Sequence, residues 1–300
     1  MSISRRNFIA SGAAAGAAMM TGASKASAIE VKGVDKNGKG VLNLSSQDGV
    51  IPGKTLEEKL DKMEKWGFVG VEFWGGKLWE RVEQIESALK GRSIRVSAIC
   101  AGFDGAPAAH EPSERRRAVE SIKKILPAAG ELGSTGLIIV PAFNSQTSLG
   151  VVGARYVFMD IASELGDAAK AAGTRILLEP LNRGESWYLR QLSDAAAICK
   201  EANNPGLCMM GDFYHMGVEE PCDYAAFISC RNYVHHVHLA SRPHRKQPGY
   251  DQGDDFRPGF RALKEIGYQD FCSLECGIEG KPDEEIPKAV AFLRQQWEES

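Results

Sequence analysis

The strongest constraint on the fold is a regular alternation of short apolar segments with amphipathic segments from Val41 to the C-terminus. Strands and helices that alternate in this way predict a parallel sheet, because parallel strands need a crossover connection and the crossover is usually a helix. Eight such units are the number that closes a barrel. The expected strands are Val41–Ser46, Val69–Trp74, Arg95–Ala101, Gly136–Ala142, Arg175–Leu181, Leu207–Phe213, Val234–Ala240 and Phe271–Gly277.

The intervening segments carry helix signals. Thr55 followed by Glu58 is typical of a capping box, and several glycines fall where a helix C-terminus needs a left-handed residue. The expected helices are Leu56–Trp66, Leu78–Lys90, Ser113–Leu132, Gly153–Ala172, Leu192–Ala202, Asp223–Cys230, Phe256–Ile266 and Asp283–Trp297; the glycines are Gly67, Gly133, Gly173 and Gly267. The alternative is an open doubly wound sheet, which usually has a glycine-rich loop after its first strand. That loop is absent here, so we expect a single (β/α)8 TIM barrel over residues 29–300.

Residues 1–28 have the pattern of an export signal. Arg5 and Arg6 precede Asn7-Phe8-Ile9, an Ala/Gly-rich stretch follows, and Ala26-Ser27-Ala28 offers a cleavage site. This segment resembles a twin-arginine signal peptide and predicts a mature, periplasmic chain from about residue 29. The alternatives are an uncleaved anchor or a chance basic pair.

Composition narrows the partners. The chain has 39 acidic and 36 basic residues and no concentrated basic face, which argues against nucleic acid as a partner. In the mature form no membrane partner is expected either. The seven cysteines form no C-x-x-C pair, so we expect buried free thiols rather than a thiolate metal site. Whether the chain forms a homo-oligomer stays open.

Four consecutive expected strands each carry a possible metal ligand at a similar depth: Glu179, Asp212, His238 and Glu275. In this fold the functional groups lie at the C-terminal ends of the strands. Three carboxylates brought together inside a barrel repel each other unless a cation neutralises them. Oxygen ligands with a single imidazole favour Mn²⁺ or Mg²⁺ over structural zinc.

Taken together, these motifs resemble the xylose-isomerase-like barrel superfamily, and most of all its hydroxypyruvate isomerase and ketose 3-epimerase branch. The resemblance covers the chain from about Val41 onward. It implies the four metal ligands above, with Glu179 and Glu275 also catalytic, and it implies that His215, Glu185 and Arg245 hold the substrate. The motifs that carry it are Glu-Pro-Leu-Asn-Arg at 179–183, Asp-x-x-His at 212–215, His-Val-His at 236–238, Pro-His-Arg-Lys-Gln-Pro-Gly at 243–249 and Leu-Glu at 274–275.

Two residues of the second expected strand are further candidates for substrate contact. Glu72 is expected to face the mouth, where it either binds a sugar hydroxyl or caps the next helix, and Trp74 is expected to wall the pocket. His236 shares the inward face with His238 but lies deeper, so support or packing is expected of it rather than ligation.

The resemblance implies an isomerase or epimerase of a small keto sugar or hydroxy-keto acid, with proton transfer through a metal-stabilised enediolate. An unphosphorylated substrate is expected, because no Arg or Lys cluster follows the strand ends. Three alternatives stay open: a lyase that removes water from a keto-inositol or 3-keto sugar, a sugar-binding barrel without catalysis, and an abasic-site endonuclease, which the acidic balance disfavours.

Overall fold

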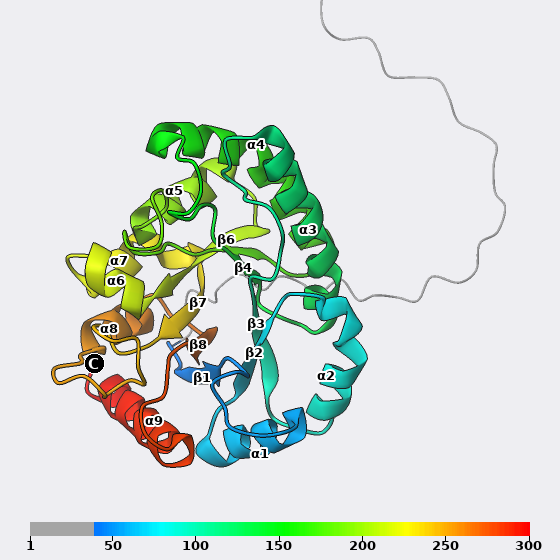
Figure 1. The fold of residues 1–300 in the computed structure, drawn as a ribbon. Coiled ribbons are helices and arrows are strands. Elements are labelled where there is room, and N and C mark those ends of the chain that lie inside the picture. Colours follow the sequence, from blue (N-terminus) through cyan, green and yellow to red (C-terminus); the bar gives the residue numbers. More distant parts are fainter. Residues whose placement is uncertain (1–38) are drawn as a thin grey trace, which may run out of the picture.

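The computed structural model describes residues 39–300, so the expected signal peptide at 1–28 lies outside the described residues. Eight parallel strands form one sheet around a central axis, with the helices in an outer ring (Figure 1). The predicted (β/α)8 barrel is confirmed. The strands are β1 Asn43–Ser46, β2 Gly70–Trp74, β3 Arg95–Cys100, β4 Leu137–Ile139, β5 Ile176–Leu178, β6 Leu207–Asp212, β7 Val234–Leu239 and β8 Phe271–Leu274.

The barrel closes between β1 and β2, the two ends of the strand order β1-β8-β7-β6-β5-β4-β3-β2. The backbone N–H of Val69 donates to Leu44 O at 2.9 Å, and that of Asp48 donates to Glu72 O at 3.0 Å. An isolated parallel bridge pairs Gln47 with Glu72. The closure therefore brings the residue after β1 against the middle of β2.

The longer helices follow the predicted segments closely. Thr55 caps the first helix by accepting from Glu58 N at 3.2 Å, and the four predicted terminal glycines all have positive φ. The helices are α1 Leu56–Trp66, α2 Val82–Leu89, α3 Pro112–Glu131, α4 Gly150–Ala171, α5 Leu192–Ala202, α6 Phe213–Glu219, α7 Asp223–Cys230, α8 Arg257–Glu265 and α9 Pro282–Glu298.

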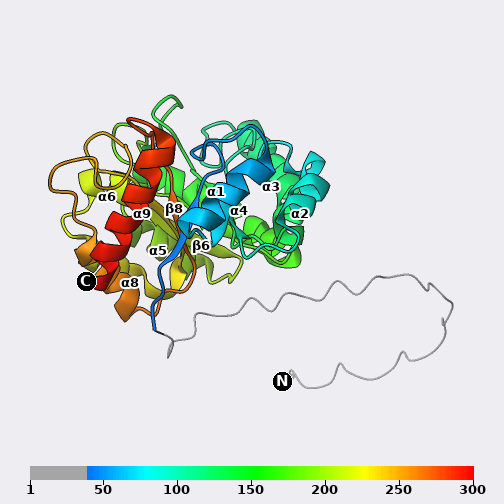
Figure 2. The same cartoon turned by 90° about the horizontal axis from the view of Figure 1, so that it is seen from below.

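The first and last helices lie side by side and complete the outer ring (Figure 2). Lys62 on α1 lies 2.6 Å from Asp283 on α9, and Arg294 donates to the carbonyl of Gly67 at 2.9 Å. Within residues 39–300, none of the helices combines the length and the apolar character needed to span a membrane.

Two local features differ from the sequence prediction. The expected helix Leu78–Lys90 is divided into a 3₁₀ turn, η1 Leu78–Glu80, and α2. The short helix α6 was not expected, because it begins directly at the end of a strand. Its first turn is stabilised by Asp212, whose side chain accepts from Tyr214 N at 2.7 Å. A second 3₁₀ turn, η2 Arg231–Tyr233, precedes β7.

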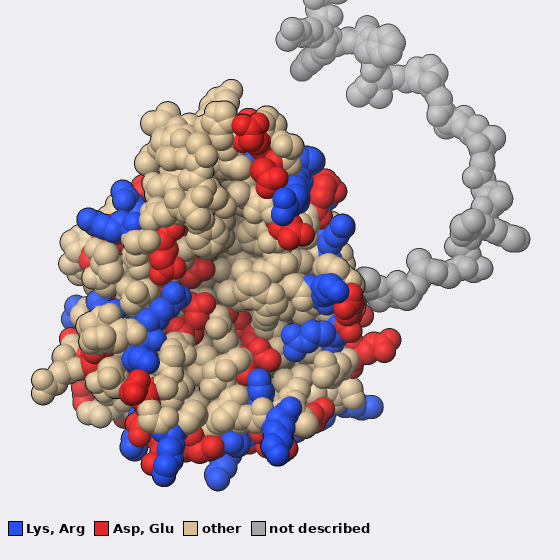
Figure 3. Space-filling model, viewed as in Figure 1, with Lys and Arg blue, Asp and Glu red and all other residues tan. Residues whose placement is uncertain are grey.

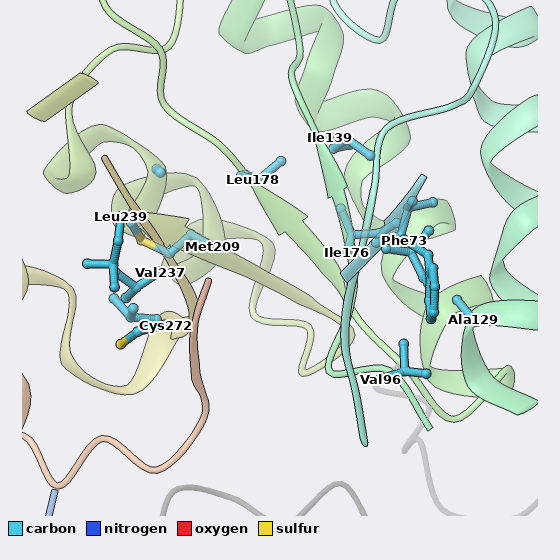
Figure 4. Close-up of a cluster of buried hydrophobic side chains, with 14 of the residues drawn as sticks. Phe73, Val96, Ala129, Ile139, Ile176, Leu178, Met209, Val237, Leu239 and Cys272 are labelled. Atoms are coloured by element: carbon cyan, nitrogen blue, oxygen red, sulfur yellow. The ribbon is translucent and has the colours of Figure 1, made fainter. Parts of the chain in front are cut away.

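Alternating side chains of the strands build two apolar layers. Outward-facing residues such as Ile139, Leu178 and Met209 pack against the helices (Figure 4). Inward-facing residues fill part of the barrel with a smaller cluster: Ala98, Ile138, Leu177, Cys208 and Met210. The seven cysteines are all free thiols, of which Cys222 is exposed. The packed interior supports the residues at the mouth.

Candidate metal centre and active site

The four predicted ligands meet at the C-terminal ends of neighbouring strands. Glu179 follows β5, Asp212 ends β6, His238 lies in β7 and Glu275 follows β8. One ligand atom from each lies within 4.8 Å of the others. In Figure 3, acidic side chains line the hollow at the centre of the molecular face, with basic side chains beside them. The expected constellation is therefore present in the fold.

The Nδ1 atom of His238 faces the three carboxylates. It lies 3.5 Å from Glu179 Oε1, 3.9 Å from Asp212 Oδ2 and 3.1 Å from Glu275 Oε2. The first two of these oxygens and Nδ1 itself are buried without a hydrogen-bond partner. Buried polar atoms in proteins are normally satisfied. A divalent cation fits this group, since it would coordinate all the unpartnered atoms and neutralise the carboxylates.

The electrostatics of the cluster are uneven. Burial, together with the charge of Glu275, raises the pKa of Asp212 to about 6. Burial also raises the pKa of Glu179. At Glu275, burial is outweighed by His238 and Arg245, which hold the pKa at about 2. The two glutamates thus occupy opposite electrostatic environments, one favouring the proton and one favouring the charge.

The three predicted substrate-binding residues border the same cluster. The Nε2 atom of His215 lies 3.6 Å from Asp212 Oδ2. Arg245 Nη2 lies 2.5 Å from Glu275 Oε2, and its Nη1 lies 3.6 Å from Glu185 Oε1. His215 is buried, whereas Glu185 and Arg245 are partly exposed. These positions place a cation and several hydrogen-bonding groups above the metal ligands.

The hydrogen bonds of His215 define which of its nitrogens carries a proton. The backbone N–H of Asn182 donates to Nδ1 at 3.1 Å, so Nδ1 is an acceptor. Burial lowers the pKa of the ring, which favours the neutral form. The proton of a neutral His215 is therefore on Nε2, an atom that is buried and has no protein partner. His215 presents a hydrogen-bond donor to the site.

Glu72 is not where it was expected. Its side chain is completely buried rather than facing the mouth, because β2 continues for two more residues beyond it. Side chains two apart share a face of the strand, so Trp74 takes the position at the mouth and is 57% exposed. Glu72 therefore lies one layer below the metal ligands and neither binds a sugar hydroxyl nor caps a helix.

The structure also shows partners of this site that sequence reasoning did not assign. Gln47 Nε2 lies 2.9 Å from both Glu72 Oε1 and Glu275 Oε1. Tyr214 packs its ring against the guanidinium of Arg245, with 4.8 Å between the Arg245 Cζ atom and the ring centroid. Gln47 follows the first expected strand, so the rule that functional groups follow strand ends was the signal that could have found it.

A (β/α)8 barrel with an oxygen-rich ligand set at its strand ends is the architecture of a metal-assisted barrel enzyme. The chain belongs to the xylose isomerase-like TIM barrel family, whose model matches residues 60–296. This confirms the family expected from the motifs.

Individual relatives narrow the class. The chain is 29% identical over 264 residues to 3-dehydro-D-guloside 4-epimerase of Escherichia coli, an alignment that covers 84% of this chain and 99% of the relative. It is 25% identical to a ketose 3-epimerase of Arthrobacter globiformis, covering 72% and 75%. The solved structure of 3-keto-D-glucoside 4-epimerase from E. coli superimposes with a TM-score of 0.78 at 29% identity, covering 85% and 100%. These relatives support an enzyme of the sugar isomerase and epimerase class.

Proposed function

We propose that this protein is a divalent-metal-dependent epimerase of a small keto sugar. The observation that carries the proposal is the convergence of buried, unpartnered atoms of Glu179, Asp212 and His238 beside Glu275. The relatives named above act on 3-dehydro-D-guloside, ketoses and 3-keto-D-glucoside, so keto glycosides and free ketoses are the substrate classes to test first.

Glu179, Asp212, His238 and Glu275 would hold the cation, with Mn²⁺ or Mg²⁺ favoured by the carboxylate-rich set. When bound, the cation supplies electrostatic stabilisation for negative charge that develops on the substrate oxygens. Those oxygens are the carbonyl oxygen and a neighbouring hydroxyl of a keto sugar.

Glu179 and Glu275 are suited to move the proton. They follow β5 and β8, which are not adjacent in the sheet, so their carboxylates approach the pocket from different sides. One carboxylate removes the proton from the carbon beside the carbonyl, and the other returns a proton to the opposite face. Glu275 stays ionised, whereas Glu179 accepts a proton more readily, and such divergent environments are typical of acid–base pairs.

The remaining residues orient the sugar. His215 donates from Nε2 to a substrate oxygen, and Arg245 stabilises negative charge on the opposite side of Asp212. Glu185 accepts from a sugar hydroxyl at the more exposed edge of the site. Trp74 offers an aromatic face at the mouth for the C–H face of a sugar.

The test is a substrate screen in heavy water with Mn²⁺ present. Unphosphorylated ketoses, 3-keto glycosides and hydroxypyruvate are incubated with the protein and followed by NMR. Solvent deuterium at the carbon next to the carbonyl, with appearance of the epimer, is expected for at least one keto sugar. Loss of water from the substrate instead indicates a lyase. Bound metal without exchange on any of these compounds indicates a sugar-binding barrel.

The proposal includes a location. Export by the twin-arginine route would deliver an already folded protein to the periplasm, where free sugars and glycosides are available. The support is the sequence of residues 1–28 alone.

A further inference from the structure

A buried carboxylate lies directly beneath the metal ligands, and three side chains donate to it. Glu72 is completely buried in the barrel and accepts from His236 Nε2 at 2.8 Å, His238 Nε2 at 3.1 Å and Gln47 Nε2 at 2.9 Å. We infer that Glu72 is a positioning residue that holds the imidazole of His238 with Nδ1 toward the cation. The inference rests on the proposed metal centre.

The contact determines which nitrogen of His238 is available as a ligand. Both oxygens of Glu72 lie near Nε2, at 3.1 and 3.2 Å. An ionised carboxylate only accepts hydrogen bonds, so Nε2 carries a proton. Coordination therefore falls to Nδ1, the atom that faces Glu179, Asp212 and Glu275. A carboxylate that fixes the orientation of a ligand histidine is a recurrent arrangement in metal sites.

The ring orientation is specified as well as the protonation. Turning the imidazole by half a turn about Cβ–Cγ would exchange Nδ1 with Cδ2 and Nε2 with Cε1. Two carbons would then face the carboxylates above and below. Because His238 is fully buried, no water is at hand to compensate for the lost contacts. Glu72 thus selects the orientation in which Nδ1 faces the site.

Glu72 can act in this way because its own position is fixed. His236, one layer deeper on β7, donates to Oε2, and Gln47 donates to Oε1. The closure of the barrel between β1 and β2 brings Gln47 to this position. The same Gln47 nitrogen lies 2.9 Å from Glu275 Oε1. The network therefore touches two of the four ligands, His238 and Glu275.

The competing explanation is that Glu72 contributes only a negative charge near the cation. Glu185 separates the two explanations, because it is also a carboxylate at the site but lies among Arg245 and His215 without contacting His238. Replacing either glutamate by glutamine removes one charge with little change of shape. Only Glu72→Gln puts an amide N–H among three donors and so disrupts the contact to His238.

The first measurement is the Mn²⁺ affinity of the full-length protein and its variants. We expect Glu72→Gln to weaken binding about 10- to 100-fold, the usual effect of losing the partner of a ligand histidine, and Glu185→Gln to change it much less. Gln47→Leu leaves the buried carboxylate in place and is expected to give an intermediate loss. It also tests the network if Glu72→Gln does not fold.

The second measurement follows the ring of His238 by ¹⁵N NMR in the Mg²⁺-loaded protein. We expect a slowly exchanging proton on Nε2 in the parent and a faster exchange of that proton in Glu72→Gln. Parental Mn²⁺ affinity in Glu72→Gln or Gln47→Leu, or equal losses in Glu72→Gln and Glu185→Gln, would overturn the inference. A parent that binds no Mn²⁺ contradicts the proposed metal centre itself, a result distinct from any of these.

Discussion

The backbone N–H of Asn182 donates to Nδ1 of His215 at 3.1 Å, and this contact turns the histidine into a hydrogen-bond donor toward the pocket. A peptide N–H has no other role than donation, so the assignment does not depend on how the side-chain amide of Asn182 is oriented. The neighbouring Asp212 and Arg245 then place this donor within the site.

His215→Gln tests the donor. A hydrogen bond to a group that carries charge contributes roughly 1.5–3 kcal/mol, so kcat/KM should fall about 10- to 100-fold. Mn²⁺ affinity should stay at the parental value, because His215 is not among the four ligands. His110→Gln, an exposed histidine that contacts Glu111, is the matched control. Parental kcat/KM in His215→Gln would show that the donor is not used.

Two substitutions of Asp212 separate its ligand role from its structural role. Oδ1 caps α6 through Tyr214 N, and Oδ2 faces His238. Asparagine can still cap a helix but lacks the charge, whereas alanine lacks both. Both variants should lose Mn²⁺, as His238→Ala should. Without metal, Asp212→Asn should be more stable than Asp212→Ala by about 1 kcal/mol, measured by urea unfolding. Metal content unchanged in these variants would remove the site.

The pH dependence of stability should reflect a histidine away from the site. Burial lowers the pKa of His235, but Asp270 at 2.7 Å and Cys208 outweigh it and raise the pKa to about 9 from an ordinary 6.5. Because the folded pKa is the higher one, the stabilisation is complete below pH 6.5 and is lost as the pH rises through 9. It amounts to roughly 2–3 kcal/mol, since Asp270 is partly exposed to solvent.

Asp270→Asn is the variant for this measurement. The difference in unfolding free energy between parent and variant should be largest at pH 6 and should shrink toward pH 10. A difference that is constant over this range would show that the pair does not titrate as described.

Much of the fold and of the site follows from local sequence patterns. Strand alternation placed His238 on the inward face, and the rule about strand ends singled out Glu179, Asp212 and Glu275. Depth along the barrel was harder to predict. The position of Glu72 depends on where β2 ends, and the contact of Gln47 depends on closure between strands that pair only through isolated contacts. Such relationships between distant segments leave no periodic signal in the sequence.

The short helix α6 was missed for a related reason. Its seven residues follow β6 without a loop, and its cap is Asp212, a residue whose position at a strand end indicated a ligand. A single carboxylate with two roles gives a sequence signal for only one of them.

The export prediction concerns residues outside the described structure. Arg5→Lys together with Arg6→Lys should trap a longer precursor in the cytoplasm, because the twin-arginine pair is the recognition element of that route. Immunoblots of cytoplasmic and periplasmic fractions detect the change in size and location. Normal delivery of the double variant to the periplasm would show that the signal was misinterpreted.

The central claim is that Glu179 and Glu275 move a proton at a metal-dependent site. Its most direct test is the rate of epimer formation and of solvent deuterium uptake in Glu179→Gln and Glu275→Gln, each loaded with Mn²⁺ and given a keto sugar that the parent converts. Glu86→Gln, an exposed glutamate on α2, is the control. Each active-site variant should lose conversion by about 100-fold or more, the usual contribution of a positioned acid or base. One of them should still exchange the substrate proton with solvent, since its remaining carboxylate reaches one face of the carbon. Conversion at the parental rate in both variants would contradict the two-carboxylate mechanism and leave the pair as metal ligands only.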